Sequence, residues 1–230
     1  MAMDRSGNKR VGVFGGTFDP IHCGHLRAAE EVCQARGLDE LFFMPAAIPP
    51  HKQNVPVSSA ARRLAMIELA IRGHARFRCS TYELDKGGTS YSIDTLSGFR
   101  RETGQELYFI IGWDAFCEIS TWKDYQRLFG VSHFVVMSRS GTEPGWLDQE
   151  QLDFFPVAIK ADFCYENKGV YRHRSGNLVY FQPVTRLDIS SSMIRRERRA
   201  GRSITCLVAG AVHDYIIEHD LYRDNPAFFK

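Results

Sequence analysis

Short apolar segments that stop at a glycine or a polar turn alternate with longer amphipathic segments along most of the chain. The apolar segments are rich in β-branched and aromatic residues, which is typical of buried strands. They are Val11–Phe14, Leu41–Met44, Phe77–Leu84, Leu107–Ile111, Phe134–Met137 and Asn177–Gln182. Strands that alternate with helices usually form parallel sheets, because each parallel connection needs a crossover. The pattern therefore predicts an α/β fold with a doubly wound parallel sheet and helices on both faces.

The amphipathic segments carry recognisable start and stop signals. Serines precede one of them, and a glycine follows most of the others, as expected at helix ends. The predicted helices are Cys23–Arg36, a segment capped by Ser58 or Ser59, Ile93–Thr103, Ser190–Ala200 and Ile204–His219. The last two have no strand between them. We therefore expect a Rossmann-like domain with a small C-terminal helical portion.

The chain length of 230 residues suits one globular domain. We expect a flexible leader over 1–10 and a single domain over 11–230. The C-terminal helical portion would occupy about 185–230. Residues 140–174 show the least periodicity, and we interpret them as a peripheral insertion rather than a second domain.

Charge and cysteine content exclude several classes of protein. With 29 basic and 27 acidic residues, the net charge of +2 predicts no broad surface for nucleic acid. The arginine run over 195–202 is interpreted as a solvated helix face. Six scattered cysteines without a CxxC pair fit reduced thiols better than disulfides. No apolar run approaches the ~18 residues of a membrane span. We expect a cytoplasmic protein with neither a membrane nor a nucleic-acid partner.

The loop after the first predicted strand carries two glycines and two histidines that favour phosphate. It reads GGTFDPIHCGH from Gly15 to His25. Paired glycines at a strand end let the backbone turn sharply and approach a ligand. His22 and His25 lie one turn apart at the start of the predicted helix, where backbone N–H groups and the helix dipole favour anions. Gly24 removes a side chain that would block that approach.

Two other interpretations of these histidines stay open. They can form a zinc pair with Cys23, although Cys23 would point away from their shared face and no further ligand cluster appears. They can also be buried structural histidines. The P-loop and GxGxxG fingerprints are absent, so we expect neither a kinase-type nucleotide site nor an ordinary dinucleotide site.

A second polar motif, ISSSMIR, runs from Ile189 to Arg195. It places three serine hydroxyls at the start of a predicted helix and an arginine on its first turns. Such a helix start binds anions, and arginine can contact phosphate through two parallel hydrogen bonds. Taken alone, the motif also fits an ordinary serine-capped surface helix.

Other short motifs follow the remaining strands. PPHK ends at Lys52, SYSIDTL begins at Ser90, IIGWD ends at Asp114, and a TW pair ends at Trp122. In this order, together with the two motifs above, they resemble bacterial nicotinate mononucleotide adenylyltransferases of the nucleotidyltransferase superfamily. The resemblance extends from residue 11 to about residue 222 and is weakest over 140–174.

The resemblance implies an enzyme of NAD synthesis. It would transfer the adenylyl group of ATP to nicotinate mononucleotide and release pyrophosphate. Mg²⁺ would be carried with the ATP phosphates, and we expect no metal site built from protein side chains alone. ATP and nicotinate mononucleotide are the partners that the resemblance implies.

The motifs and the resemblance together assign candidate site residues. The expected catalytic residues are His22, His25, Lys52 and Arg195. The expected ATP-binding residues are Gly15, Gly16, Thr17, Phe18, Gly24, Gly112, Asp114, Ile189, Ser190, Ser191 and Ser192. The expected nicotinate mononucleotide-binding residues are Ser92, Thr95 and Trp122.

Simpler roles remain open for several of these residues. Lys52 can be a surface lysine, Trp122 a core residue and Asp114 part of an exposed turn. Ser92 and Thr95 can cap a helix. The chain departs from the resembled pattern at Ser192, which replaces a threonine, and at Ala209, which replaces a frequent proline.

Two alternatives to the expected function also stay open. One is a sister adenylyltransferase that uses phosphopantetheine or nicotinamide mononucleotide as its acceptor. The other is a catalytically silent nucleotide sensor on the same fold.

Overall fold

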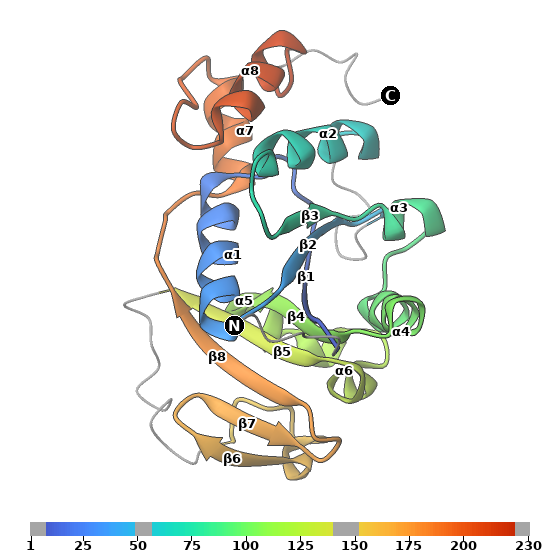
Figure 1. The fold of residues 1–230 in the computed structure, drawn as a ribbon. Coiled ribbons are helices and arrows are strands. Elements are labelled where there is room, and N and C mark those ends of the chain that lie inside the picture. Colours follow the sequence, from blue (N-terminus) through green and yellow to red (C-terminus); the bar gives the residue numbers. More distant parts are fainter. Residues whose placement is uncertain (1–7, 49–56, 140–151, 224–230) are drawn as a thin grey trace, which may run out of the picture.

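The computed structural model describes residues 8–48, 57–139 and 152–223. Its strands form one sheet in the order β3-β2-β1-β4-β5-β8-β7-β6 (Figure 1). The strands are β1 (Arg10–Gly16), β2 (Glu40–Pro45), β3 (Phe77–Cys79), β4 (Glu106–Gly112), β5 (His133–Arg139), β6 (Phe163–Asn167), β7 (Val170–His173) and β8 (Leu178–Val184). Strands β1 to β5 and β8 are parallel, whereas β6 and β7 form an antiparallel edge. The predicted α/β fold is confirmed.

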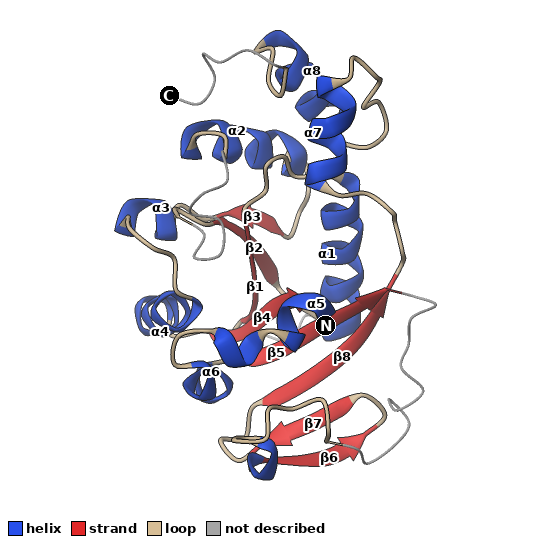
Figure 2. Ribbon diagram, turned by 180° about the vertical axis from the view of Figure 1, so that it is seen from behind, coloured by secondary structure: helices blue, strands red, loops and turns tan. Residues whose placement is uncertain are grey.

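Helices cover both faces of the sheet (Figure 2). They are α1 (Cys23–Arg36), α2 (Ala60–Ile71), α3 (Tyr82–Lys86), α4 (Ser92–Thr103), α5 (Trp113–Cys117), α6 (Tyr125–Val131), α7 (Ser191–Arg199) and α8 (Gly210–Glu218). Helices α1, α2, α7 and α8 pack on one apolar cluster, and α4, α5 and α6 pack on another. None of the helices in the described ranges is long and apolar enough to cross a membrane.

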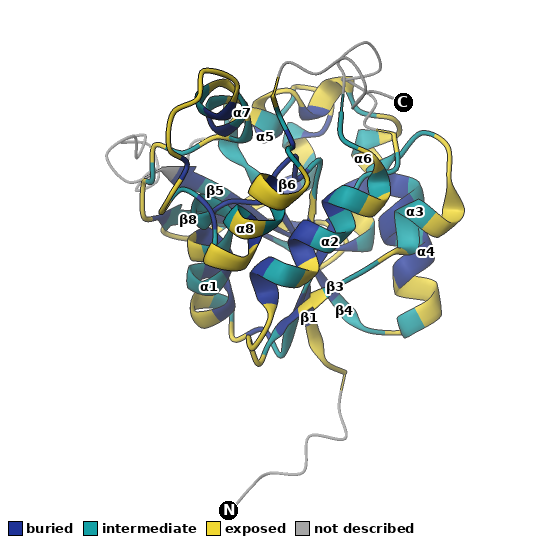
Figure 3. Ribbon diagram, turned by 90° about the horizontal axis from the view of Figure 1, so that it is seen from above, coloured by how far each residue is buried: buried dark blue, intermediate teal, exposed yellow. Residues whose placement is uncertain are grey.

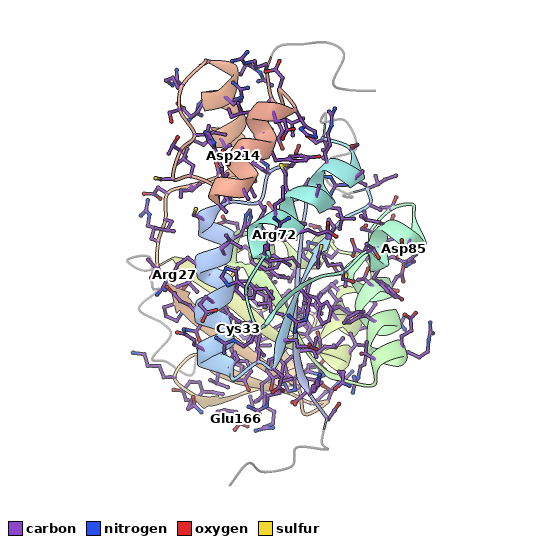
Figure 4. All side chains as sticks on the ribbon, turned by 45° about the horizontal axis from the view of Figure 1, so that its top comes forward. Arg27, Cys33, Arg72, Asp85, Glu166 and Asp214 are labelled. Carbon is purple, nitrogen blue, oxygen red and sulfur yellow. The ribbon has the colours of Figure 1, made fainter. Side chains whose placement is uncertain are left out.

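Alternating strand residues supply the two clusters. In β4, Phe109 and Ile111 belong to one cluster and Ile110 to the other, since successive strand side chains point to opposite faces. Buried positions follow the strands and the inner sides of the helices (Figure 3). On α1, Cys33 is fully buried while Arg27 pairs with Glu31 at the surface (Figure 4).

The structure corrects two of the predicted elements. The strand expected over 77–84 ends at Cys79, and α3 follows, with Thr81 donating a hydrogen bond to Asp85. The last helix was expected from residue 204 but begins at Gly210. Cys206 explains the later start of the helix, because its left-handed φ of 64° does not continue a helix.

The predicted leader and insertion are also refined. Residues 1–7 of the leader lie outside the described residues, whereas Arg10 already belongs to β1. Within 140–174, residues 140–151 lie outside the described part. The rest includes all of β6 and β7, and they extend the main sheet because β7 pairs antiparallel with β8 and β6 with β7.

His173, at the end of β7, makes the stability of this edge depend on pH. It is buried, and its Nδ1 accepts the Ser175 backbone N–H at 3.2 Å. Burial lowers the pKa of His173 below 6.5. The unfolded chain therefore takes up a proton at a higher pH than the folded chain. Stability should be fully present above about pH 6.5 and fall as the pH drops toward the folded-state pKa.

We expect His173→Asn to reduce this loss, because asparagine can still accept the Ser175 N–H but does not titrate. Urea unfolding at about pH 7.5 and 5.5 measures it. His219→Asn, at an exposed position, is the control and should keep the wild-type dependence. If wild type and His173→Asn lose the same free energy of unfolding between these pH values, another group controls the acid sensitivity.

Candidate active site

A cavity of about 690 Å³ lies beyond the carboxyl ends of β1 and β4 and gathers residues from both polar motifs. The predicted site residues on its wall are His22, Gly24, His25, Gly112, Asp114, Ile189, Ser190, Ser191, Ser192 and Arg195. They are up to 173 positions apart in the sequence, and the sheet topology brings them together. We call this the larger cavity.

His22 and His25 form a reciprocal cap at the start of α1. The His25 backbone N–H donates to His22 Nδ1 at 3.4 Å, and the His22 backbone N–H donates to His25 Nδ1 at 3.2 Å. The two rings stack with centroids 3.6 Å apart. Because each Nδ1 accepts a backbone hydrogen, each ring carries a proton on Nε2. The cap thus fixes both rings and makes Nε2–H the group that can donate to a ligand.

Gly24 has a second role beside the expected one. A Cβ atom at this position would lie 3.0 Å from His22 Nδ1 and 3.1 Å from its Cε1. The glycine therefore leaves room for the His22 ring that caps the helix, in addition to lining the cavity.

A second helix start faces the same cavity. Ser190 is the N-cap of α7, since its hydroxyl accepts the Met193 N–H at 3.1 Å. The Ser190 and Ser192 hydroxyls are 3.1 Å apart. Ser191 donates to the Pro20 carbonyl at 2.8 Å, which joins α7 to the loop after β1. Two helix N-termini, those of α1 and α7, thus place positive dipole ends beside one cavity, an arrangement that favours anions.

Arg195 adds a cation to this site. Its Nη1 donates to the Asp19 carbonyl at 2.7 Å, and the side chain lines the larger cavity. The other N–H groups of a guanidinium can bind phosphate oxygens while one is held by a carbonyl.

A smaller cavity of about 340 Å³ lies next to the larger one. The predicted residues that line it are Gly15, Gly16, Thr17, Ser92, Thr95, Gly112 and Trp122. The two glycines and Thr17, expected to contact ATP, therefore lie on this side. Phe14 and Gly112 line both cavities, so the two meet where β1 and β4 lie side by side. Strand order reverses between these strands, which is where doubly wound sheets bind ligands.

Phe18 lines neither cavity. Its side chain is 2% exposed and packs edge-on against Phe14 and Phe43, 5.7 Å from each. A Cβ on Gly16 would come within 2.9 Å of the Phe18 ring. The Phe18 side chain is thus part of the core that supports the loop, and a contact between Phe18 and ATP stays a prediction.

Trp122 forms part of the wall of the smaller cavity. It is half-buried, and its ring meets Phe109 edge-on at 6.2 Å. It follows the short 3₁₀ turn Ile119–Thr121. An indole that is packed on one side and faces a cavity on the other can stack on an aromatic ligand.

Glu83 is an acidic group in the smaller cavity that the sequence did not indicate. The Thr95 hydroxyl donates to its Oε1 at 2.7 Å, so this hydroxyl is engaged within the protein. Burial raises the pKa of Glu83, partly offset by hydrogen bonds from Thr95 and Ser90. Because 77–84 was predicted as a strand, no pattern pointed to a carboxylate on α3.

The larger cavity also contains residues without a sequence signal, among them Met137, Thr185 and Arg186. Their positions follow from the pairing of β5 with β8, which the sequence does not specify. Arg186 is paired with Asp188 at 2.8 Å.

Three further expectations concern Lys52, a zinc site with Cys23 and the state of the cysteines. Lys52 lies outside the described residues. Cys23 lines neither cavity, and among the described residues no group of three or more His, Cys, Asp or Glu could hold a metal ion. All six cysteines are free thiols.

The arginine run is mostly engaged within the chain. Arg198 is buried and binds Asp220 at 3.1 Å, and Arg196 and Arg202 both pair with Glu197. The earlier view of the run as a simple solvated face therefore holds only in part.

Comparisons with known proteins show which family the chain is similar to. A family model described as "Cytidylyltransferase-like" matches residues 13–197. A Geobacter sp. (strain M21) protein named "Probable nicotinate-nucleotide adenylyltransferase" is 45% identical over 217 residues, which are 94% of this chain and 99% of the relative. A protein of the same name from Syntrophotalea carbinolica is 44% identical over 216 residues, covering 93% and 97%.

A solved structure shows the same fold at low identity. Plasmodium falciparum nicotinic acid mononucleotide adenylyltransferase complexed with NaAD matches with a TM-score of 0.70 and 19% identity, over 93% of this chain and 97% of that one. With relatives this similar over nearly the whole length, the chain belongs to the cytidylyltransferase-like family and, within it, to the nicotinate-nucleotide adenylyltransferases.

Proposed function

We propose that this chain transfers the adenylyl group of ATP to nicotinate mononucleotide, giving nicotinate adenine dinucleotide and pyrophosphate for NAD synthesis. The observation that carries the proposal is the junction of two unlike cavities at Phe14 and Gly112. One presents two helix N-termini, two imidazoles and a guanidinium, as a triphosphate requires. The other has mostly apolar walls and an indole, as a pyridine ring requires.

The reaction needs positioning rather than a strong base. An oxygen of the mononucleotide phosphate attacks the α-phosphorus of ATP. The bond from that phosphorus to the oxygen bridging to the β-phosphorus breaks, and pyrophosphate leaves with the electron pair. The second pKa of a phosphate monoester is near ~6, so the nucleophile is already mostly ionised at neutral pH. Catalysis then comes from holding two anions in line and stabilising the charge between them.

The residues of the larger cavity supply that stabilisation. His25 and His22 donate from Nε2–H to oxygens of the transferring phosphate, with His25 as the main transition-state contact. Arg195 and the α7 serines bind the remaining phosphate oxygens, and Lys52 is a further cation for them. Asp114, at the start of α5, accepts from ribose hydroxyls. Trp122 stacks on the nicotinate ring, while Ser92 and Thr95 shape the same cavity.

Magnesium belongs to the nucleotide substrate in this proposal. Mg²⁺ keeps several waters and usually binds through phosphates and one or two carboxylates. The larger cavity offers mainly Nε2–H donors, hydroxyls and two guanidinium groups, which suit phosphate oxygens, and Asp114 is the one carboxylate among its described lining residues. The ion would therefore sit on the β- and γ-phosphates.

We also propose that the reaction takes place in the cytoplasm. The six unpaired thiols support a reducing compartment.

An acceptor comparison tests the proposal. Purified protein receives ATP and magnesium with nicotinate mononucleotide, nicotinamide mononucleotide or phosphopantetheine, and pyrophosphate release is followed. We expect the fastest release with nicotinate mononucleotide. A preference for phosphopantetheine would identify the sister enzyme, equal rates with both mononucleotides would refute the preference for the acid, and no release with any acceptor would favour a silent sensor.

A further inference from the structure

Asp19 is a buried carboxylate in the loop after β1, and other parts of the chain bind both of its oxygens. The residue is 3% exposed. The Ser58 backbone N–H donates to Oδ2 at 3.2 Å, and the Tyr222 hydroxyl donates to Oδ1 at 2.7 Å. Burying a charge is costly unless it is hydrogen-bonded and paired. The loop conformation around Asp19 therefore depends on these distant partners.

A buried guanidinium balances the Asp19 charge. Arg63 of α2 is 2% exposed and donates to the backbone carbonyls of Thr17 and Ser58, both at 3.0 Å. Burial lowers the pKa of Arg63, and the nearby Asp19 carboxylate acts in the opposite direction. Asp19 and Arg63 thus fix the same stretch of loop from two sides.

The backbone of the fixed loop holds the phosphate-binding residues. The Asp19 carbonyl accepts from Arg195 Nη1, and the next carbonyl, that of Pro20, accepts from the Ser191 hydroxyl. Both donors come from α7, and both line the larger cavity. Any rotation of Asp19 would move the carbonyl that orients the Arg195 guanidinium.

The chain adopts an unusual backbone to bring Tyr222 to Asp19. Asp220 and Tyr222 both have left-handed φ angles, 48° and 62°. Such angles are uncommon for residues other than glycine and are retained where the surrounding structure fixes them. Leu221 between them is 1% exposed, and Asp220 pairs with the buried Arg198 of α7. The turn after α8 is therefore anchored by the two residues that directly precede the tyrosine.

The Tyr222 hydroxyl is a hydrogen-bond donor to a carboxylate throughout the neutral range. Burial and the adjacent Asp19 raise the pKa of Tyr222 well above 10, so the phenol keeps its proton. The hydroxyl also lies 3.8 Å from the Met66 sulfur of α2. Helices α2 and α8 pack on the same apolar cluster, which keeps this end of the chain in place (Figure 1).

We propose that Tyr222 is a positioning residue for adenylyl transfer. Its hydroxyl holds the Asp19 carboxylate, and the Asp19 carbonyl in turn holds Arg195 against the ATP phosphates. The C-terminal turn thereby completes the nucleotide site without touching the substrate. This inference rests on the proposed function, because it assigns Arg195 to the phosphates.

Tyr222→Phe tests the proposal, since it removes one hydroxyl and keeps the ring. We expect kcat to fall about tenfold or more, because small displacements of a positioned group are costly to rate. Tyr108→Phe is the matched control: Tyr108 is also buried, its hydroxyl bonds Glu106 at 3.3 Å, and it lies near the amino end of β4. It should change kcat less than twofold. Similar rates for the two variants would overturn the inference.

A double-mutant cycle separates positioning from general destabilisation. In an Arg195→Ala background, adding Tyr222→Phe should lower kcat/KM for ATP less than twofold further, because the residue being positioned is gone. If Tyr222→Phe lowers kcat/KM for ATP by the same factor in both backgrounds, Tyr222 acts independently of Arg195 and the proposal is wrong. If Tyr222→Phe does not fold, Asp19→Asn in the same cycle makes the test, since it weakens the same contact and keeps the backbone carbonyl.

ATP binding by calorimetry provides a readout without an acceptor. We expect Tyr222→Phe to weaken ATP binding at least threefold in the wild-type background and not in Arg195→Ala. If wild-type protein binds ATP but uses no mononucleotide, the proposed function is contradicted and the positioning role of Tyr222 is not. Unchanged ATP affinity together with unchanged kcat in Tyr222→Phe would contradict the positioning role alone.

Discussion

Replacing His25 by alanine should lower kcat for adenylyl transfer by about 100-fold or more and leave the fold intact. The reciprocal cap fixes the ring and puts its proton on Nε2, so alanine removes an oriented donor to the transferring phosphate. Such donors act mainly on charge that develops in the transition state. KM values should therefore change much less than kcat.

His25→Asn separates the two roles of this residue. Asparagine can still accept the His22 N–H at the position of Nδ1, but it has no group at the position of Nε2. We expect His25→Ala to lose about 1 kcal/mol of unfolding free energy through the missing hydrogen bond and His25→Asn to recover most of it. Both variants should keep the low kcat, because both lack the Nε2–H group. Urea unfolding and initial rates of pyrophosphate release measure the two effects. A kcat for His25→Asn within threefold of wild type would remove Nε2–H from the mechanism.

Local sequence patterns were sufficient for the central sheet and its main helices. The apolar runs at β1, β2, β4 and β5 are bounded by glycine, proline or polar turns, and the structure contains a parallel strand at each. Helix α1 begins at Cys23 and ends at Arg36, as its stripe and Gly37 predict. The strands are largely buried on both faces and α1 is buried on one, and both kinds of burial leave a strong pattern in the sequence.

Weaker elements could not be predicted in the same way. Helix α3 has only five residues, and no apolar stripe can develop over so short a length. Strand β6 pairs with β7, and β7 pairs with β8, at the sheet edge, where one side is open and the pattern is less regular. The start of α8 depends on the left-handed turn at Cys206, a residue that rarely adopts this conformation.

In the candidate site too, residues in local motifs could be predicted and contacts made by tertiary packing could not. His22, His25 and Arg195 were identified because their motifs combine several signals over a few residues, and the larger cavity includes all three. Tyr222 meets Asp19 across 203 positions, and no local pattern marks either residue for that contact. Glu83 likewise meets Thr95 only because α3 packs beside α4. Contacts made by tertiary packing leave no short-range signal in a single sequence.

Arg195→Ala should lower kcat/KM for ATP by about 100-fold, because it removes a cation that is held in one orientation beside the phosphates. Arg195 Nη1 is fixed on the Asp19 carbonyl, so the guanidinium is held at one end while the side chain lines the cavity. Lysine keeps the charge but cannot donate to the carbonyl and to two phosphate oxygens in that geometry. Arg195→Lys should therefore recover no more than about tenfold of the loss.

Arg186 provides the matched control for this prediction. It lines the same cavity and carries the same charge, but its Nε is paired with Asp188. If the cavity acts on ATP only through its net positive charge, Arg186→Ala and Arg195→Ala should weaken kcat/KM equally, and both effects should fade at high salt. If the fixed hydrogen-bond geometry matters, Arg186→Ala should cost less than about threefold, and the Arg195→Ala loss should persist at high salt. Steady-state rates at low and high ionic strength decide between them, and equal losses would refute an oriented role for Arg195.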